Sequence, residues 1–330
     1  MKTKLDFHPK FFSCIRNYSK ATFMSDLMAG TIVGIVALPL AIAFAIASGV
    51  SPEKGIVTAI IAGFIVSFLG GSKVQIGGPA GAFIVIVYGV IQQYGIGGLT
   101  VATIIAGVLL ILLGAFKLGT VIKFIPYPVV VGFTSGIAVT IFTTQMADVF
   151  GLSFGGETVP GDFIGKWMLY FRHLDTINWW DAGVSILSVL IIMLVPKFSR
   201  RIPGSLVAII LVTAGVYALK TCLGIEGIDT IGDRFTIASQ LPKAEMPALD
   251  WEAVKNLFPI AVTIAALGAI ESLLSATVAD GMISDHHNSN TELIALGVAN
   301  MVAPIFGGIP ATGAIARTMT NINNGGRTPV

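Results

Sequence analysis

Charged residues are scarce in this sequence. Asp, Glu, Lys and Arg make up 12% of its 330 residues, while hydrophobic residues make up 54%. A soluble domain carries about 25% charged residues, so this composition excludes an ordinary soluble protein and indicates a multi-pass membrane protein. A net charge of only +2 also argues against a nucleic-acid partner. We therefore expect the chain to lie in the lipid bilayer of the cell (inner) membrane.

Cysteine is scarce as well. Cys14 and Cys222 are far apart and fall on opposite sides of the topology described below. A structural disulfide, a metal site or a bound cofactor is therefore not expected. The run Asp285–Asn288 contains two histidines, but it lacks further ligands, and we expect a solvated turn there. The first apolar run has no small-residue cleavage pattern after it, so we expect a membrane span and not a signal peptide.

Long apolar runs divide the chain into ten predicted spans. A basic, amphipathic lead-in at residues 1–25 precedes them, and a surface helix is predicted at 163–172. A helix needs about 20 residues to cross the hydrocarbon core, and span three, with about 15 residues after Gly78, falls short of that length. The other spans are predicted at 27–49, 55–71, 99–116, 128–146, 180–195, 204–218, 257–278 and 293–305, and a tenth begins at Gly307.

Two Gly/Pro breaks interrupt the chain where a membrane helix would be continuous. The first is Gly77–Ala82, with an extended, β-like lead-in at 73–76, and the second is Gly307–Ala314. Paired, short, interrupted spans in corresponding halves are the strongest sequence pointer to the substrate site of a transporter. Close helix packing by small residues is the alternative explanation. The candidate substrate-binding residues in and after the breaks are Pro79, Ala80, Gly81, Thr312, Gly313, Ala314 and Ile315.

The charges in the loops predict the orientation of the spans. Basic clusters at the N-terminus, at Lys117 and Lys123, and at 197–201 fall on one side. The loops at 148–181 and 220–255 on the other side hold five acids with two bases and six acids with four bases. This is the positive-inside pattern with a cytoplasmic N-terminus. Spans three and ten then run in opposite directions, which predicts an inverted repeat of seven spans each, with the second repeat ending after its third span.

Two ionisable residues fall well inside the predicted spans. A charge at the bilayer centre costs several kcal/mol, so such residues are usually paired or functional. Two helix N-termini, each with about half a positive charge, would favour an anion between the breaks, and Arg317 would add a fixed charge beside it. Glu271 suits a coupling ion, and Ser275 shares its helix face. A purely structural ion pair between Glu271 and Arg317 is the alternative.

Several motifs in order resemble the sulfate permease family of anion transporters, also known as solute carrier 26. They are Leu38–Ala45, Gly70–Lys73, Gly78–Ala80, Pro310–Thr318 and Asn324–Pro329. The resemblance implies an all-α fold with a core domain (26–125 and 256–330) that moves against a gate domain (126–255). It also implies a homodimer and often a cytoplasmic STAS domain, which, like spans 11–14, is absent from this sequence.

The same resemblance assigns roles to residues. Phe44 would line the anion site, and Ala80, Gly81, Gly313, Ala314 and Ile315 would offer backbone N–H groups. Glu271 matches an acidic position associated with proton coupling in some members. In sodium-dependent bicarbonate members an acid and a hydroxyl one turn later bind Na⁺, and Glu271 and Ser275 hold those positions here. The bicarbonate-type members lack the arginine that Arg317 matches, which favours sulfate or another anion.

The sequence predicts an alternating-access transporter of a small inorganic or carboxylate anion. Sulfate is the first choice, followed by bicarbonate or a dicarboxylate. Proton symport is preferred and sodium coupling is the runner-up. An uncoupled anion channel and a nucleobase permease of the same architecture remain open. An enzyme is not expected, because no nucleophile and base stand together within the spans.

Overall fold

The computed structural model describes residues 7–120, 127–198, 204–224, 227–235, 243–247 and 251–330. The chain forms two compact units, one of residues 1–129 and 238–330 and the other of residues 130–237. Among the described residues, six helices are long and apolar enough to cross a membrane. Many large apolar side chains on these helices are exposed. Such exposure is expected where lipid is the solvent, because lipid tails are as apolar as the side chains.

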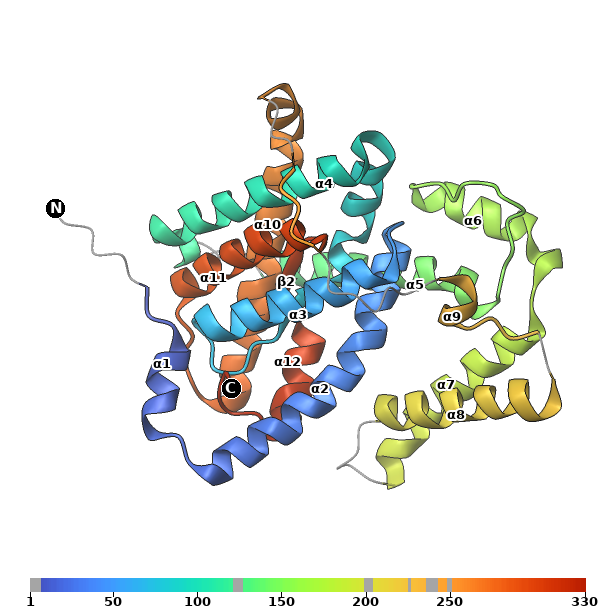
Figure 1. The fold of residues 1–330 in the computed structure, drawn as a ribbon, viewed down its shortest axis with the longest axis horizontal. Coiled ribbons are helices and arrows are strands. Elements are labelled where there is room, and N and C mark those ends of the chain that lie inside the picture. The colour runs from blue at the N-terminus through green and yellow to red at the C-terminus, as the bar shows by residue number, and fades with distance from the viewer. Residues whose placement is uncertain (1–6, 121–126, 199–203, 225–226, 236–242, 248–250) are drawn as a thin grey trace. The chain divides into compact units, whose positions relative to one another are not determined.

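In the first unit, α11 (Ser289–Val302) packs between α3 (Pro52–Leu69) and α4 (Ile84–Ala115), as Figure 1 shows. The long helix α10 (Trp251–Ile283) packs on α4, and α2 (Lys20–Ala47) packs on α3. The shorter elements of this unit are α1 (Lys10–Cys14), η1 (Ile15–Asn17), β1 (Gly77–Pro79), η2 (Gly81–Phe83), η5 (Ala303–Phe306), β2 (Ala311–Gly313) and α12 (Ile315–Asn323).

Glycines set the close approach of α4 and α11. A Cβ added to Gly107 would lie 2.7 Å from the carbonyl oxygen of Gly297, and one added to Gly297 would lie 2.6 Å from that of Gly107. A Cβ on Gly114 would lie 2.6 Å from the carbonyl oxygen of Asn290. Small residues allow the two backbones to touch, which is how membrane helices gain packing contacts without a hydrophobic driving force.

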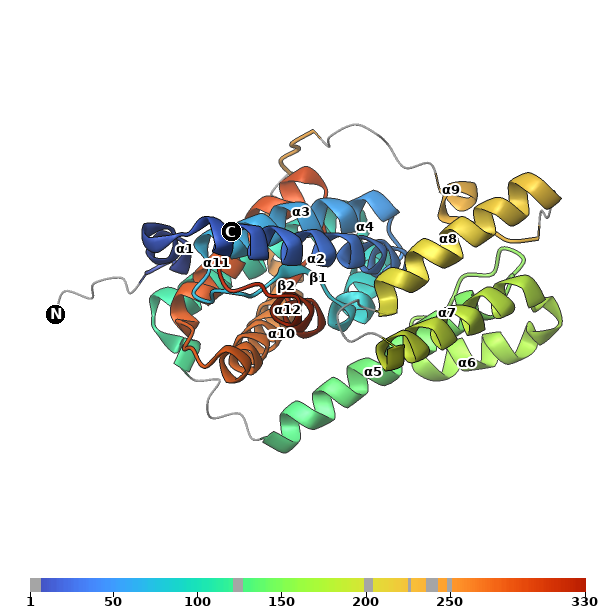
Figure 2. The same cartoon turned by 90° about the horizontal axis from the view of Figure 1, so that it is seen from below.

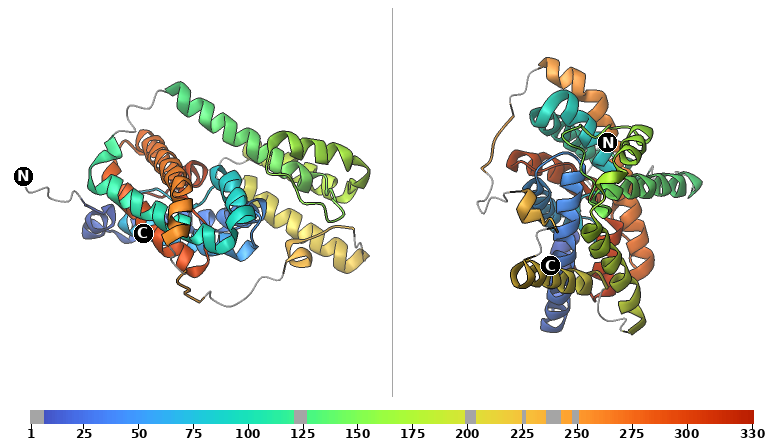
Figure 3. Two further views of the ribbon diagram at one scale, coloured as in Figure 1. Left: turned by 90° about the horizontal axis from the view of Figure 1, so that it is seen from above. Right: turned by 90° about the vertical axis from the view of Figure 1, so that its right-hand side faces the viewer.

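The second unit contains most of α5 (Tyr127–Val149), together with α6 (Phe163–Arg172), α7 (Trp179–Phe198), α8 (Gly204–Leu223) and α9 (Ile231–Arg234). Helices α7 and α8 pack against each other (Figure 3). Helix α6 has the bounds of the predicted surface helix. Asp162, directly before the helix, is its N-cap residue. Its carboxylate accepts a hydrogen bond of 2.6 Å from the backbone N–H of Gly165.

Most predicted spans correspond to helices, with three differences. Spans three and four are joined in α4, where Gly95 takes a positive φ of 67° and kinks the helix between them. Helix α7 continues past Pro196, because a proline in the last turn removes a single backbone hydrogen bond. The extended segments are also displaced: the strands form at the breaks themselves, in β1 and β2, and residues 73–76 before them are not a strand.

Two acidic residues outside the predicted spans lie inside helices and are buried. Asp26 lies in α2, because that helix begins at Lys20, earlier than predicted. Its carboxylate accepts hydrogen bonds from the backbone N–H of Arg327 and from the hydroxyls of Tyr18 and Thr328. Glu292 lies in the first turn of α11 and is 0% exposed. Buried acidic residues therefore also occur near the starts of α2 and α11, in addition to the two ionisable residues well inside the predicted spans.

Candidate functional site

The two sequence breaks meet as a two-stranded antiparallel sheet. Gly77 pairs with Gly313, Gly78 with Thr312 and Pro79 with Ala311. Figure 2 shows β1 and β2 side by side, with α12 and α10 next to them. A helix starts directly after each strand, η2 and α4 after β1 and α12 after β2. The pairing therefore brings together the first turns of the two helices that follow the breaks, although the breaks lie 231 positions apart in the sequence.

Asn300 completes the outer edge of β2. Its side-chain amide donates a hydrogen bond of 2.8 Å to the carbonyl oxygen of Ala311 and accepts one of 2.9 Å from the N–H of the same residue. Nearby, the Thr312 hydroxyl donates to the carbonyl oxygen of Gly268 on α10. Non-helical backbone at membrane depth is tolerated only where the protein or a watery cavity satisfies its polar groups. Here the Asn300 side chain of α11 does so for Ala311.

A reciprocal pair of caps holds the two chain segments that lead into the strands. The Thr58 hydroxyl on α3 accepts a hydrogen bond of 2.7 Å from the N–H of Ile309, two residues before β2. Glu292 on α11 accepts bonds of 2.8 and 3.1 Å from the N–H groups of Gly71 and Ser72, just after α3. A polar side chain on each helix therefore accepts hydrogen bonds from the backbone N–H groups that follow the other helix. This exchange fits an inverted repeat.

Arg317 lies in α12 and is only 3% exposed. Its Nη2 donates a hydrogen bond of 2.7 Å to the carbonyl oxygen of Pro79 on β1, while Nη1 is buried without a hydrogen-bond partner among the described residues. A Cβ added to Gly78 would lie 2.2 Å from Nη1, so a glycine is required for the guanidinium to lie there. The charge of Arg317 is thus held directly against β1.

Glu271 and Arg317 do not form an ion pair within 4 Å, so the structural ion pair considered above is not present in the described structure. Glu271 Oε2 is buried and has no hydrogen-bond partner among the described residues. Ser275, one turn later, donates a hydrogen bond of 3.3 Å to the Thr318 hydroxyl, which in turn accepts one from the N–H of Ile76. The Ser275 hydroxyl therefore connects α10 to α12 and to the start of β1.

Gln75 is a residue of this site that the sequence analysis missed. Its Nε2 donates to the hydroxyl and the carbonyl oxygen of Ser272, at 2.6 and 3.1 Å, while its Oε1 is buried without a partner among the described residues. A Cβ on Gly313 would lie 1.9 Å from Gln75 Nε2. A polar residue between the apolar Val74 and Ile76, directly before the break, was the signal that could have identified it.

The remaining predicted site residues have simpler surroundings. Ala80 and Gly81 are buried directly after β1, and Ala314 and Ile315 are half-buried at the start of α12. Phe44 is half-buried in the last turn of α2. Within the described part of the chain, the site therefore presents one unpartnered donor, Arg317 Nη1, and two unpartnered acceptors, Gln75 Oε1 and Glu271 Oε2. Such a set can hold an anion on the donor side and a cation or proton on the acceptor side.

Comparisons with known proteins give a consistent result. The Sulfate permease family matches residues 23–330. YvdB, a candidate sulfate transporter of Bacillus subtilis, is 45% identical over 97% of this chain and 60% of its own length. The bicarbonate transporter BicA of Picosynechococcus is 32% identical over 92% of this chain and 54% of its own length. The chain thus spans little more than half the length of these curated relatives.

The fold is shared with a solved structure. The transmembrane domain of a cyanobacterial bicarbonate transporter, BicA, matches with a TM-score of 0.81 and 30% identity, over 94% of this chain and 79% of that one. This match confirms the predicted fold class, an all-α polytopic inverted repeat with broken helices at the third and tenth spans. The resemblance read from the sequence motifs is confirmed as well.

Proposed function

Because the chain belongs to the sulfate permease family, we propose that the protein is a secondary active transporter of a small anion. The pairing of β1 with β2 is the observation that carries this proposal. It brings two helix starts together, and unpaired N–H groups at helix N-termini favour an anion between them. The guanidinium of Arg317, fixed on the Pro79 carbonyl, adds a full positive charge at the same place.

Sulfate is the proposed substrate, with bicarbonate or a dicarboxylate as the next choice. The family and one relative are named for sulfate, and another relative is named for bicarbonate. Arg317 supports sulfate, because a buried arginine can neutralise part of the charge of a dianion. The ligands Ala80, Gly81, Gly313, Ala314 and Ile315 remain proposals, and so does the role of Phe44.

Coupling to a proton at Glu271 is the proposed energy source. One oxygen of this carboxylate, Oε2, is buried without a hydrogen-bond partner among the described residues. A carboxylic acid in such surroundings can exchange a proton as the site opens to one side and then to the other. The neighbouring acceptor Gln75 Oε1 favours sodium as the second candidate, because amide and carboxylate oxygens are the ligands of such cations.

We further propose that the two compact units act as the core and the gate of alternating access. The first unit, residues 1–129 and 238–330, resembles in its bounds the core expected from the sequence, and residues 130–237 resemble the gate. Both strands and every proposed ligand belong to the first unit. A homodimer and a cytoplasmic N-terminus, the latter favoured by the loop charges, complete the proposal.

Uptake of labelled sulfate into proteoliposomes tests these statements. Uptake should saturate, should be reduced by unlabelled substrate, and should rise with an inward proton gradient. Bicarbonate and succinate as competitors rank the alternative substrates, and uptake with and without Na⁺ separates the two coupling ions. Glu271→Gln should abolish the response to the proton gradient and retain sulfate binding. Sulfate currents that rise linearly with voltage, without saturation, would instead indicate a channel.

A further inference from the structure

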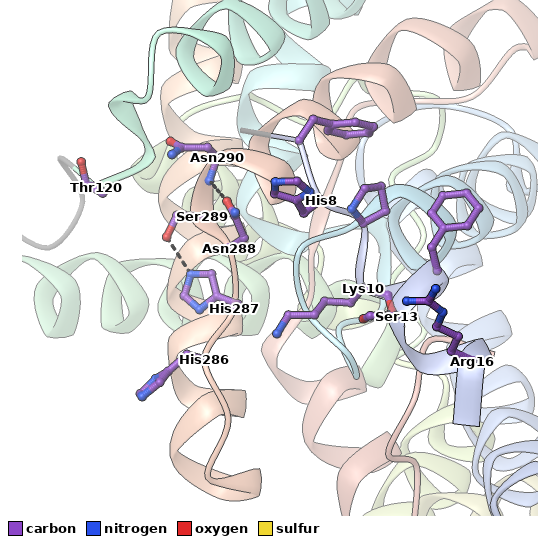
Figure 4. Close-up of a pocket in the computed structure, with 13 residues that line it drawn as sticks. His8, Lys10, Ser13, Arg16, Thr120, His286, His287, Asn288, Ser289 and Asn290 are labelled. Atoms are coloured by element: carbon purple, nitrogen blue, oxygen red, sulfur yellow. Dashed lines mark hydrogen bonds between the residues drawn. The ribbon is translucent and has the colours of Figure 1, made fainter. Parts of the chain in front are cut away.

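A polar groove of about 940 Å³ lies in the first unit, and no residue of β1 or β2 lines it. One wall is the N-terminal segment around α1, and the other is the loop between α10 and α11, as Figure 4 shows. None of the residues proposed to bind the transported anion lines it. The groove is therefore a feature that the proposed transport mechanism does not use.

The groove is lined by groups that bind anions. Arg16 and Lys10 are the cations, and hydroxyl and amide groups come from both walls. No Asp or Glu is present among the described residues that line the groove. Arg16 forms no ion pair within the described part of the chain. The other polar side chains of the lining include His8, Ser13, His286, His287, Ser289 and Asn290.

Hydrogen bonds fix the conformation of the loop wall. Asp280 Oδ2 accepts hydrogen bonds from the backbone N–H of His287, at 3.0 Å, and lies 2.7 Å from its ring Nδ1. The other ring nitrogen, Nε2, lies 2.9 Å from the Ser289 hydroxyl, a contact drawn in Figure 4. The His287 side chain is only 8% exposed. Its orientation is thus set from both sides before any ligand binds.

The N-terminal wall is fixed to the same helices. The N–H of Lys10 donates a hydrogen bond of 3.0 Å to the carbonyl oxygen of Gly70, at the end of α3. The N–H of His8 donates to the Thr291 hydroxyl on α11 at 3.1 Å. The ring of Phe11 packs on that of Phe68, with centroids 4.8 Å apart. These contacts hold the backbone of the N-terminal segment against α3 and α11.

The local charge remains positive after the nearby ion pairs are counted. Asp285 lies 3.0 Å from Lys73 and 3.8 Å from Lys10, so one carboxylate serves two ammonium groups. Asp280, which bonds to His287 in the groove wall, is the second carboxylate nearby. Lys10, Lys73 and Arg16 therefore exceed the two carboxylates by one positive charge. In Figure 4 the Lys10 side chain extends from the N-terminal segment toward the α10–α11 loop, across the groove.

We propose that this groove binds a phosphate group, carried by an anionic lipid headgroup or by a soluble phosphate monoester. A phosphate oxygen accepts several charge-assisted hydrogen bonds, and guanidinium, ammonium and hydroxyl groups on two facing walls can supply them. Phe12 and Ile15, 55% and 51% exposed, flank Arg16 on the same segment. Basic side chains next to exposed apolar ones are typical of a segment at a membrane surface, where headgroup phosphates lie.

Two binding measurements on the purified full-length protein test the proposal and separate the two sources. In detergent, the protein is titrated with glycerol 3-phosphate as the soluble monoester. Retention of phosphatidylglycerol, compared with phosphatidylcholine, is measured by native mass spectrometry. Arg16→Gln is the main variant, because the side chain is exposed and its loss should not disturb folding. Lys20→Gln is the matched control, since it removes the same charge from an exposed position outside the groove.

We expect Arg16→Gln to weaken phosphate binding about tenfold, the effect of losing one charge-assisted hydrogen bond, and Lys10→Gln with Arg16→Gln to abolish it. Lys20→Gln and Arg317→Ala should leave it unchanged. Selective retention of phosphatidylglycerol identifies the lipid, and tight binding of glycerol 3-phosphate identifies the soluble source. The proposal is overturned if neither probe binds, or if Arg16→Gln and Lys20→Gln lose phosphate affinity equally. It is also overturned if Arg317→Ala is the one variant that loses phosphate binding.

Discussion

The side-chain amide of Asn300 bonds to both the N–H and the C=O of Ala311. It thereby makes the two hydrogen bonds that a neighbouring strand would make with this edge of β2. Asn300 is only 1% exposed. The backbone that follows Ala311 carries the N–H groups proposed to hold the anion. The orientation of those groups therefore depends on a side chain that does not itself belong to the strands.

Asn300→Ala should destabilise the protein and impair transport. It leaves two buried backbone groups unpaired, each costing about 1–3 kcal/mol. The thermal unfolding temperature of the detergent-solubilised variant should fall, and sulfate affinity should fall with it. Thr100→Ala is the control, because that exposed hydroxyl bonds only to the carbonyl oxygen of Ile96 on its own helix. An unfolding temperature equal to that of the control would contradict the role given to Asn300.

Gly78→Ala should reproduce the effect of Arg317→Ala. The new Cβ would overlap Arg317 Nη1, and the flexible end of the arginine would have to move away from Pro79. We expect each variant to raise the KM for sulfate about tenfold or more, as for the loss of a charge-assisted contact to a dianion. The double variant should be less stable than Arg317→Ala alone, because Gly78 has a φ of +155°, which strains any residue with a Cβ. Gly89→Ala, where an added Cβ meets nothing within 4 Å, should leave KM unchanged.

The sequence predicted the elements that repeat a pattern and missed the contacts between them. The two breaks, their opposite directions and the surface helix at 163–172 followed from glycine, proline and charge patterns. The contacts of Gln75 and Asn300 could not be predicted, because they depend on partners 197 and 11 positions away, Ser272 and Ala311. Glu292 was missed because α11 begins a few residues earlier than its apolar run, and helix ends are hard to place from hydropathy alone.

The reciprocal caps on α3 and α11 make a paired prediction. Thr58→Val removes the acceptor for the N–H of Ile309, and Glu292→Leu removes the acceptor for those of Gly71 and Ser72. Each change leaves buried donors unpaired, so we expect a loss of about 1–3 kcal/mol for the first and more for the second. Chemical denaturation in detergent measures both. Thr140→Val, an exposed hydroxyl bonded within α5, serves as the control and should cost less than about 0.5 kcal/mol.

The pH dependence of stability should reveal the ion pairs of Asp285. Burial raises the pKa of this carboxyl, but the backbone N–H of His286 and the charges of Lys73 and Lys10 outweigh burial and lower the pKa below its usual value. A carboxyl with a lowered folded-state pKa stabilises the protein above its unfolded pKa of about 3.9 and loses that effect as the pH falls through the folded value.

Asp285→Asn should therefore be less stable than the wild type at pH 6, by about 0.5–1 kcal/mol because the pair is partly exposed. The difference should shrink as the pH is lowered below about 4, where the unfolded and then the folded carboxyl become protonated. Unfolding temperatures of the two proteins, measured side by side over this range, test the sign directly. A difference that grows at low pH would mean that burial, and not the lysines, dominates the energy of this carboxyl.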